Sequence, residues 1–320
     1  MSQVLVTGYT GFVGSHLLSS FENLQNINLL GRSQPTKCSQ FLKASIDSSS
    51  DYSVVLDKVS TVIHIAARVH VMNDESDDPL EEFRAVNTAG TMNLARQAAE
   101  AGVKRFIFVS SIKVNGESTT GKQAFTAQDT PSPEDPYGVS KAEAEEQLIA
   151  LGEETGLEIV IIRPPLVYGE GVKANFASLM NLVSKGIPLP FGCLTQNKRS
   201  LVSVDNLVDL IVTCIDHPKA ANQVFLVSDD HDVSTSEMVR QMALALVKRT
   251  WQLPVPVWCY NLAGKLFNKS DVVDRLTGSL QVDITHTKET LGWTPPQSLQ
   301  EGFKQTAEAF LQSKKNNGKV

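Results

Sequence analysis

The spacing of three glycines near the N-terminus constrains the fold of this 320-residue chain more than any other feature. Residues 3–18 read "QVLVTGYTGFVGSHLL", in which a short β-rich run precedes the glycines and an amphipathic segment follows them. Gly8 permits a tight turn out of a strand, Gly11 lets the backbone approach a pyrophosphate, and Gly14 lets a helix pack close to the sheet. A helix that begins there presents free N–H groups and the positive end of its dipole to phosphates. The pattern predicts a dinucleotide site, and an ordinary strand-to-helix turn is the alternative.

Continuous apolar runs recur along the chain and predict parallel strands that are buried on both faces. These runs lie at 27–30, 61–67, 105–111, 158–164 and 223–228. Helical patterns at 79–101 and 137–156 fall between them. Strands that alternate with helices predict an α/β fold with a Rossmann-type, doubly wound parallel sheet.

The chain becomes irregular after Pro164, with loops rich in glycine and proline and helical patterns near 175–185, 205–216 and 234–248. We expect residues 1–165 to form an NAD(P)-binding domain and residues 166–320 to form a smaller α/β region that binds the substrate. The two are expected to interleave, because the run at 223–228 has the character of a strand that returns to the main sheet.

Charge and cysteine content exclude several classes of protein. The net charge of −6 argues against nucleic acid or an anionic membrane as the main partner, although local arginines can still bind a phosphate. The four cysteines are scattered without a CxxC pair, so neither a disulfide framework nor a metal site is expected, and a reducing cytoplasm is favoured. No apolar run reaches about 18 residues and no signal peptide is recognisable, so no membrane span is predicted.

The end of the second predicted strand bears on the choice of cofactor. An acid at this place accepts hydrogen bonds from the adenosine ribose and favours NAD. Here the strand ends Leu30-Gly31-Arg32-Ser33, and no acid is present. Arg32 is suited to pairing with a 2′-phosphate, which favours NADP, and an exposed loop arginine is the alternative.

Tyr137 and Lys141 are spaced four residues apart at the start of a predicted helix, so both project from one face. A phenol with its ordinary pKa near 10 is a poor base at neutral pH, and a neighbouring cation is expected to lower that pKa. The phenol could then take a proton from a substrate hydroxyl while hydride leaves the same carbon. A half-buried tyrosine beside a surface lysine is the alternative reading of this spacing.

Two further polar features support a role of Tyr137 and Lys141 in proton transfer. Ser110 and Ser111 end the run at 105–111, at the carboxyl edge of the predicted sheet, where sites form in open α/β proteins. Asn87 lies inside a predicted helix, where asparagine is mildly unfavourable, so a role in ordering backbone or water near Lys141 is one reading and a tolerated surface residue is the other.

The chain resembles the extended short-chain dehydrogenase/reductase family over almost its whole length. The motifs that carry this resemblance are the glycine cluster, "HIAA", "NTAGT", "VSSIKVNG", the YxxxK pair and "RPPLVYG". Within this family the chain is similar to nucleotide-sugar epimerases, dehydratases and 4-ketoreductases. The resemblance implies that Tyr137 is the acid/base, Lys141 its electrostatic partner, Ser111 the hydroxyl that holds the reacting oxygen, and Asn87 the fourth member of the set. It also implies a homodimer formed through the helices at 80–101 and 137–156.

The resemblance extends to the binding residues. The cofactor residues that it implies are Gly8, Gly11, Phe12, Val13, Gly14, Arg32, Ile46, Ala66, Ala67, Tyr137, Lys141 and Pro164. The substrate residues that it implies are Ser111, Tyr137, Asn175, Arg199 and Arg275, of which the two arginines suit a nucleotide diphosphate.

Departures from the family pattern narrow the reaction. Ile112-Lys113 stands where dehydratases carry an Asp-Glu pair, so a 4,6-dehydratase is not expected, and Leu166 replaces an asparagine that touches the nucleotide-sugar in many relatives. The resemblance therefore implies hydride transfer at C4 of a UDP-hexose or UDP-N-acetylhexosamine, as in a UDP-glucose 4-epimerase, in polysaccharide precursor synthesis. A UDP-4-keto-6-deoxy-hexosamine 4-ketoreductase remains the alternative, because the same residues serve both reactions. A non-catalytic NAD(P) sensor is disfavoured because the Ser-Tyr-Lys set is intact. A reductase of small apolar ketones is also disfavoured, because Arg199 suits a diphosphate.

Overall fold

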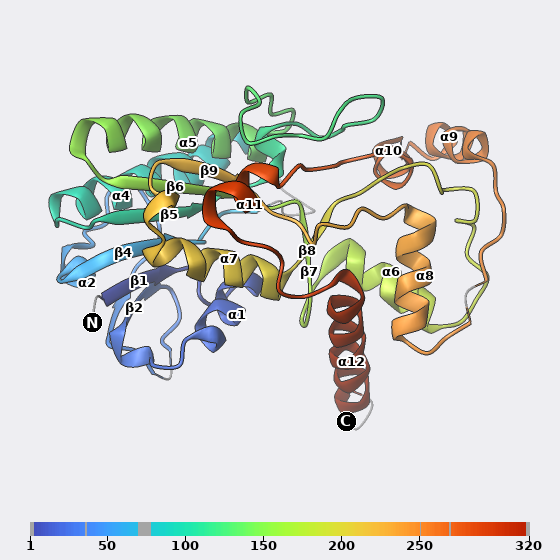
Figure 1. Ribbon diagram of the computed structural model, residues 1–320, viewed down its shortest axis with the longest axis horizontal. Helices are drawn as coiled ribbons and strands as arrows, with labels where there is room; N and C mark the ends of the chain where they lie inside the picture. Colours follow the sequence, from blue (N-terminus) through green and yellow to red (C-terminus); the bar gives the residue numbers. More distant parts are fainter. Residues whose placement is uncertain (1–2, 36, 70–77, 250, 269, 318–320) are drawn as a thin grey trace.

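Seven parallel strands form the central sheet of the computed structural model, which describes residues 3–35, 37–69, 78–249, 251–268 and 270–317. The strand order is β3-β2-β1-β4-β5-β6-β9 (Figure 1). The strands are β1 (Gln3–Thr7), β2 (Ile27–Gly31), β3 (Gln40–Lys43), β4 (Val59–His64), β5 (Arg105–Val109), β6 (Glu158–Arg163) and β9 (Gln223–Leu226). Because the order reverses between β1 and β4, a crevice is expected at the carboxyl ends of these two strands.

Helices cover both faces of the sheet, because successive side chains of each strand point to opposite sides. Val4 and Val6 of β1 belong to a core shared with α1 (Phe12–Ser20) and α7 (Val204–Asp216), and α11 (Thr285–Leu291) closes the end of this layer. Leu5 belongs to the opposite core, which packs against the helices of the other face, α2 (Ser53–Leu56), α4 (Thr91–Glu100) and α5 (Pro136–Thr155). This three-layer arrangement confirms the predicted Rossmann-type α/β fold.

A second region lies beyond the carboxyl ends of the strands (Figure 1). It contains a two-stranded parallel sheet, β7 (Leu166–Tyr168) and β8 (Leu201–Ser203), with α6 (Ala174–Ser184), α8 (Thr235–Ala245) and α12 (Leu299–Asn317) around a separate core. At its far end lie α9 (Val257–Leu266) and α10 (Ser270–Thr277). The loop after β5 joins this region to the first, since Phe125 N–H donates to Gln281 O at 2.9 Å.

Several elements differ from the sequence predictions, and α2, β7 and β8 are among those not predicted. β3 was not predicted, because it is a short edge strand whose residues are only partly buried or exposed. The helix predicted at 79–101 is divided into α3 (Pro79–Phe83), a π-helical segment (Arg84–Gly90) and α4. Among the helices of the described residues, none is long and apolar enough to cross a membrane.

Candidate active site

The glycine loop between β1 and α1 has the close backbone packing that its spacing predicts. Gly8 has φ +72°, and a Cβ there would lie 2.5 Å from the Ala66 backbone nitrogen. A Cβ on Gly14 would lie 2.2 Å from the Gly8 carbonyl oxygen. Gly11 is the N-cap of α1 and supplies no side-chain cap, and the first turn holds no acidic residue. The N-terminus of α1 is therefore suited to an anion.

Several predicted cofactor residues surround this loop. Phe12 and Val13 begin α1 and are half-buried, while Ala66 and Ala67 follow β4 and are also partly exposed. The Ala66 N–H donates to Thr7 Oγ1 at 3.2 Å, which ties the end of β4 to the end of β1.

A buried polar chain that sequence reasoning missed supports the same strand ends. The Thr7 hydroxyl is 2.7 Å from His64 Nδ1, and His64 Nε2 is 2.9 Å from the Thr91 hydroxyl. Burial, with a contribution from the Lys141 ammonium, lowers the pKa of His64 to about 3, so the imidazole is neutral. The sequence feature that could have indicated this polar chain is the one histidine inside the apolar run at 61–67.

The remaining predicted cofactor residues lie at three different places. Arg32 is exposed and directly follows β2, where the prediction put it. Ile46 packs against the π-helical segment, since a Cβ on Gly90 would lie 2.8 Å from its Cγ2. Pro164 directly follows β6, and its carbonyl accepts the Ile112 N–H at 3.0 Å.

The start of α5 holds Tyr137 in a fixed frame. Asp135 is the N-cap, and its Oδ1 accepts the Gly138 N–H at 2.7 Å. Its other carboxylate oxygen pairs with Lys113 Nζ, which also contacts Glu117 Oε1 at 2.9 Å. Lys113, which stands where dehydratases carry an acid, thus supports the cap of α5.

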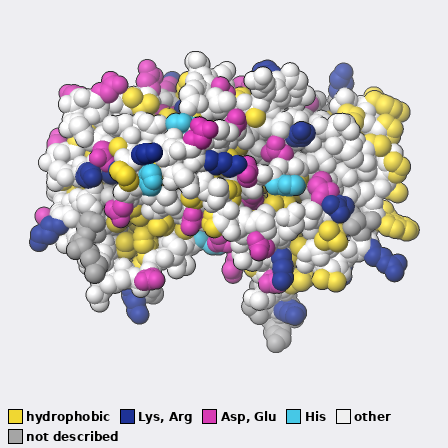
Figure 2. Space-filling model, viewed as in Figure 1, with side chains coloured by type: hydrophobic (Ala, Val, Ile, Leu, Met, Phe, Trp, Pro, Cys, Tyr) yellow, Lys and Arg dark blue, Asp and Glu magenta, His cyan; other side chains and the backbone are white. Residues whose placement is uncertain are grey.

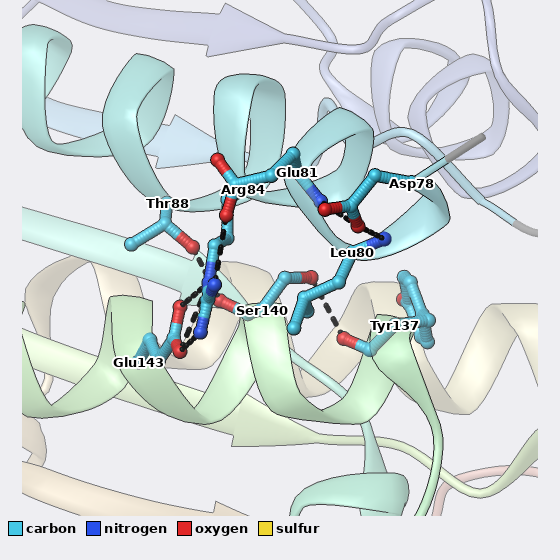
Figure 3. A network of polar contacts seen from close by, with 8 residues as sticks. All are labelled: Asp78, Leu80, Glu81, Arg84, Thr88, Tyr137, Ser140 and Glu143. Carbon is cyan, nitrogen blue, oxygen red and sulfur yellow. Dashed lines mark hydrogen bonds and ion pairs between the residues drawn. The ribbon is translucent and has the colours of Figure 1, made fainter. Parts of the chain in front are cut away.

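The Tyr137 ring packs edge-on against the Phe83 ring of α3, with centroids 5.9 Å apart. Figure 3 shows the Tyr137 carbonyl accepting the Ser140 hydroxyl at 2.8 Å, and Arg84 pairing with Glu143 between the π-helical segment and α5. The ring contact joins α3 to α5, and the ion pair joins the π-helical segment to α5.

Lys141 is fully buried one turn further along α5. Its Nζ donates to the Val109 carbonyl oxygen at 2.9 Å and lies 4.2 Å from the centroid of the Phe108 ring. Burial lowers the pKa of Lys141 to about 7. A lysine in this state carries its proton only part of the time near neutral pH, in contrast to a surface lysine.

The predicted effect of Lys141 on Tyr137 is wrong for this structure. Burial, with a smaller contribution from the Asp135 carboxylate, raises the pKa of the Tyr137 phenol. Desolvation disfavours the phenolate, and Lys141 is hydrogen-bonded to the end of β5 and partly neutral. Any lowering of the phenol pKa must therefore come from charge that a ligand brings.

Ser110 and Ser111 follow the end of β5 and differ in environment. Ser111 is partly exposed and its Oγ accepts the Lys113 N–H at 3.3 Å. The Ser110 hydroxyl is buried and has no hydrogen-bond partner among the described residues. An unpaired buried hydroxyl is unfavourable unless a ligand or water bonds to it, so both serines remain candidates to face a substrate.

Asn87 is fully buried in the π-helical segment, which excludes the surface reading. Its Oδ1 accepts the Arg68 N–H at 2.8 Å, and its Nδ2 donates to the Arg68 carbonyl at 3.0 Å and to the Ser140 hydroxyl at 3.0 Å. The adjacent Thr88 hydroxyl bonds to the Ser140 carbonyl at 2.9 Å (Figure 3). Asn87 thus joins the segment after β4 to the residue preceding Lys141.

The predicted arginine pair comes together in the second region. Arg199 Nη1 donates to the carbonyls of Arg275 at 2.9 Å and Gly278 at 3.4 Å. Burial, with a contribution from the Arg275 guanidinium, lowers the pKa of Arg199. Two close guanidinium groups repel each other, and an anion between them would relieve that repulsion. The side chain of Asn175, at the start of α6, lies outside the described residues.

The residues present fit a dinucleotide cofactor. The glycine cradle that Cβ atoms would fill, the uncapped N-terminus of α1 and the orphaned Ser110 hydroxyl all lie at the carboxyl edge of the sheet, beside the point where the strand order reverses. This fold and this site define a Rossmann-type, dinucleotide-binding enzyme.

The chain belongs to the NAD-dependent epimerase/dehydratase family, whose model matches residues 4–228. It is 64% identical over 314 residues to a UDP-glucose 4-epimerase of Vibrio cholerae, covering 97% of this chain and 96% of that protein. A UDP-glucuronic acid 4-epimerase from Bacillus cereus, solved in complex with NAD, superposes with a TM-score of 0.76 at 20% identity and covers 97% of this chain and 99% of its own. The protein MoeE5, solved with UDP-glucose and NAD, gives a TM-score of 0.77 at 24% identity with the same two coverages.

Proposed function

We propose that the protein is a UDP-hexose 4-epimerase that uses NAD to invert C4 of a UDP-hexose or UDP-N-acetylhexosamine in polysaccharide precursor synthesis. The observation that carries this proposal is the position of Tyr137 and buried Lys141 on α5, which packs against the end of β5 where Ser110 and Ser111 lie. The extent of the similarity to the Vibrio cholerae UDP-glucose 4-epimerase supports it.

The proposed chemistry assigns one task to each side chain. The Tyr137 phenol takes the proton of the C4 hydroxyl. It returns the proton after the 4-keto sugar has rotated and presents its opposite face. The Ser111 hydroxyl bonds the same oxygen, and Lys141, through its hydrogen bond to the Val109 carbonyl, holds α5 against the end of β5. NAD, when bound, supplies the acceptor and then the donor of the C4 hydride, and its positive ring favours the phenolate that burial disfavours.

The diphosphate of the substrate is assigned to the arginine pair. Arg199 and Arg275 present two guanidinium groups in the region beyond the strand ends, and Asn175 at the start of α6 is proposed to join them. In this proposal residues 1–165 with β9 hold the cofactor, and the rest of 166–320 holds the nucleotide-sugar.

A 4-ketoreductase is the second candidate, and Arg32 is the observation that favours it. Arg32 is exposed directly after β2, where an acid would favour NAD, and a guanidinium there suits the 2′-phosphate of NADPH. The substrate of that reaction would be a UDP-4-keto-6-deoxy-hexosamine, and one NADPH would be consumed per turnover.

We also infer a homodimer through the helices at 80–101 and 137–156, which the family resemblance supports, and a cytoplasmic location, which the four unpaired cysteines support. Light scattering after size exclusion tests the first inference, with a single-chain mass as the contradicting result.

The experiment that tests the function separates the two candidates directly. The folded protein is offered UDP-glucose or UDP-N-acetylglucosamine, and the sugar is analysed by proton NMR for inversion at C4. It is separately offered a UDP-4-keto-6-deoxy-hexosamine with NADPH, whose absorbance is followed. Inversion without net cofactor consumption supports the epimerase, stoichiometric NADPH oxidation supports the ketoreductase, and the absence of both reactions contradicts the proposal.

A further inference from the structure

The largest exposed apolar side chains of the second region gather on α9 and the segment that leads into it. Trp251 is 67% exposed, Trp258 is 66% exposed and Leu266 is 77% exposed. Trp258, Leu262 and Leu266 are spaced four residues apart, so they lie along one side of the helix. Figure 2 shows hydrophobic side chains at the edge of the molecule where α9 lies. We call the exposed side chains of Trp251, Leu253, Trp258, Leu262, Leu266 and Phe267 the α9 face.

Among the residues that the structure describes, none of these side chains belongs to a hydrophobic core. Only Gly264 of α9 is buried; a Cβ there would lie 2.8 Å from Val273 Cγ2, which marks the side of α9 that packs on α10. Of the three tryptophans in the sequence, Trp293 is buried in the main core, whereas Trp251 and Trp258 are exposed. An apolar face of this kind marks an interaction site more often than chance exposure.

The charge around the α9 face is opposite to that of the whole protein. Residues 247–270 contain four basic residues and no Asp or Glu, in a chain whose net charge is −6. Lys248, Arg249 and Lys265 are exposed and lie within a few residues of the apolar side chains in the sequence. Lys265 follows Trp258 by seven residues, about two helical turns, so both lie on the same side of α9.

We propose that the α9 face docks the protein on the surface of an anionic lipid bilayer. Tryptophan is favoured at the boundary between hydrocarbon and lipid headgroups, and leucine and phenylalanine can enter the acyl layer beside it. Lysine side chains on the same face can reach the anionic headgroups with their amino groups while their stems lie along the apolar surface. The local basic charge selects an anionic bilayer over an uncharged partner surface.

Docking by this face is consistent with the placement of the proposed substrate site. α9 packs on α10, and α10 carries Arg275, whose carbonyl accepts a hydrogen bond from Arg199. The helix that carries Arg275 is therefore the packing neighbour of the helix that carries the docking face. Net charge alone predicts no membrane partner, because it averages this basic segment with the acidic remainder of the chain.

Vesicle binding by the intact protein tests the proposal. Purified protein is mixed with vesicles of phosphatidylcholine alone or with added phosphatidylglycerol, and the bound fraction is measured by flotation. We expect binding to the anionic vesicles that weakens as salt is added. Tryptophan emission should shift to the blue on binding and be quenched by brominated acyl chains, because two of the three tryptophans enter the bilayer.

Substitutions locate the contact. Trp258→Ser is expected to weaken partitioning by about tenfold or more, since it removes a large apolar side chain that would enter the bilayer. Lys265→Glu is expected to weaken it by at least about fivefold. The matched controls are Val54→Ser on α2, 70% exposed, and the exposed Lys219→Glu, both outside the α9 face and expected to leave binding unchanged.

Three results would overturn the proposal. The first is the absence of binding to anionic vesicles by the wild-type protein, and the second is equal binding by wild type and Trp258→Ser. The third is a concentration-dependent dimer, measured by sedimentation, that Trp258→Ser dissociates while vesicles bind nothing; a second copy of the chain would then cover the α9 face. Far-UV circular dichroism of each variant shows that it is folded.

Discussion

Replacing Lys141 by methionine separates the chemical role of this residue from its effect on stability. Folding lowers the pKa of Lys141 from 10.5 to about 7 because the side chain is buried. Each pKa unit corresponds to about 1.4 kcal/mol, so holding this group in the folded core destabilises the native state by about 4 kcal/mol at pH 7.

The substitution also removes two contacts of the side chain, and their loss offsets part of the expected gain in stability. The hydrogen bond to the Val109 carbonyl contributes about 1 kcal/mol, and the contact with the Phe108 ring contributes about 1 kcal/mol. Methionine has a similar length and no charge, so Lys141→Met is expected to raise the free energy of unfolding at pH 7 by about 2 kcal/mol while abolishing turnover.

The pH dependence gives a second signature of the same effect. The folded pKa lies below the unfolded pKa, so the unfolded chain binds more protons between about pH 7 and pH 10.5. Wild-type stability should therefore gain about 2 kcal/mol from this group between pH 7 and pH 9. Lys141→Met should lack that gain, and Lys104→Met, at an exposed lysine, should keep it.

Urea unfolding followed by circular dichroism at both pH values measures these differences. A Lys141→Met protein that is less stable than wild type at pH 7, or that shows the same rise with pH, would refute the reasoning.

Three further predictions concern the proposed site. Tyr137→Phe should leave cofactor binding intact and lower kcat by about 10²- to 10⁴-fold, measured by C4 inversion. Gly14→Ala should prevent dinucleotide binding in calorimetry, because its Cβ would lie 2.2 Å from the Gly8 carbonyl oxygen. Arg199→Ala should raise KM for the UDP-sugar by about tenfold or more, because Arg275 alone cannot hold the diphosphate from two sides, while cofactor affinity stays unchanged.

Controls for these variants lie close by in the chain. Ser15→Ala changes an exposed side chain next to Gly14 and should bind the cofactor normally. Arg240→Ala removes an exposed arginine of α8 in the second region and should leave KM unchanged. Equal KM effects of Arg199→Ala and Arg240→Ala would contradict the assignment of the diphosphate site.

The sequence predicted the main architecture because buried parallel strands are long apolar runs. The runs at 27–30, 105–111 and 158–164 correspond to β2, β5 and β6, and the family was recognisable from motifs at their ends. β3 escaped prediction because an edge strand with exposed residues lacks that signal. The π-helical segment escaped because its hydrophobic pattern resembles that of an ordinary helix.

The structure brings several of the predicted site residues together, but their electrostatics could not be predicted from the sequence. Asn87 was ambiguous in the sequence, and only the fold shows that it is buried and bonded to Arg68 and Ser140. The spacing of Tyr137 and Lys141 indicated a low phenol pKa, whereas burial raises it, and burial depends on contacts such as Phe83 that are distant in sequence. The roles of these residues stay predictions until the variants are measured.

The fate of a label at C4 tests the central claim most directly. UDP-galactose carrying deuterium at C4 is incubated with the protein in ordinary water, and the product is analysed by NMR and mass spectrometry. Hydride transfer predicts UDP-glucose that keeps the deuterium at C4, with no net change in cofactor. Loss of the label to solvent, or recovery of UDP-galactose alone, would contradict the claim that the protein inverts C4 by hydride transfer.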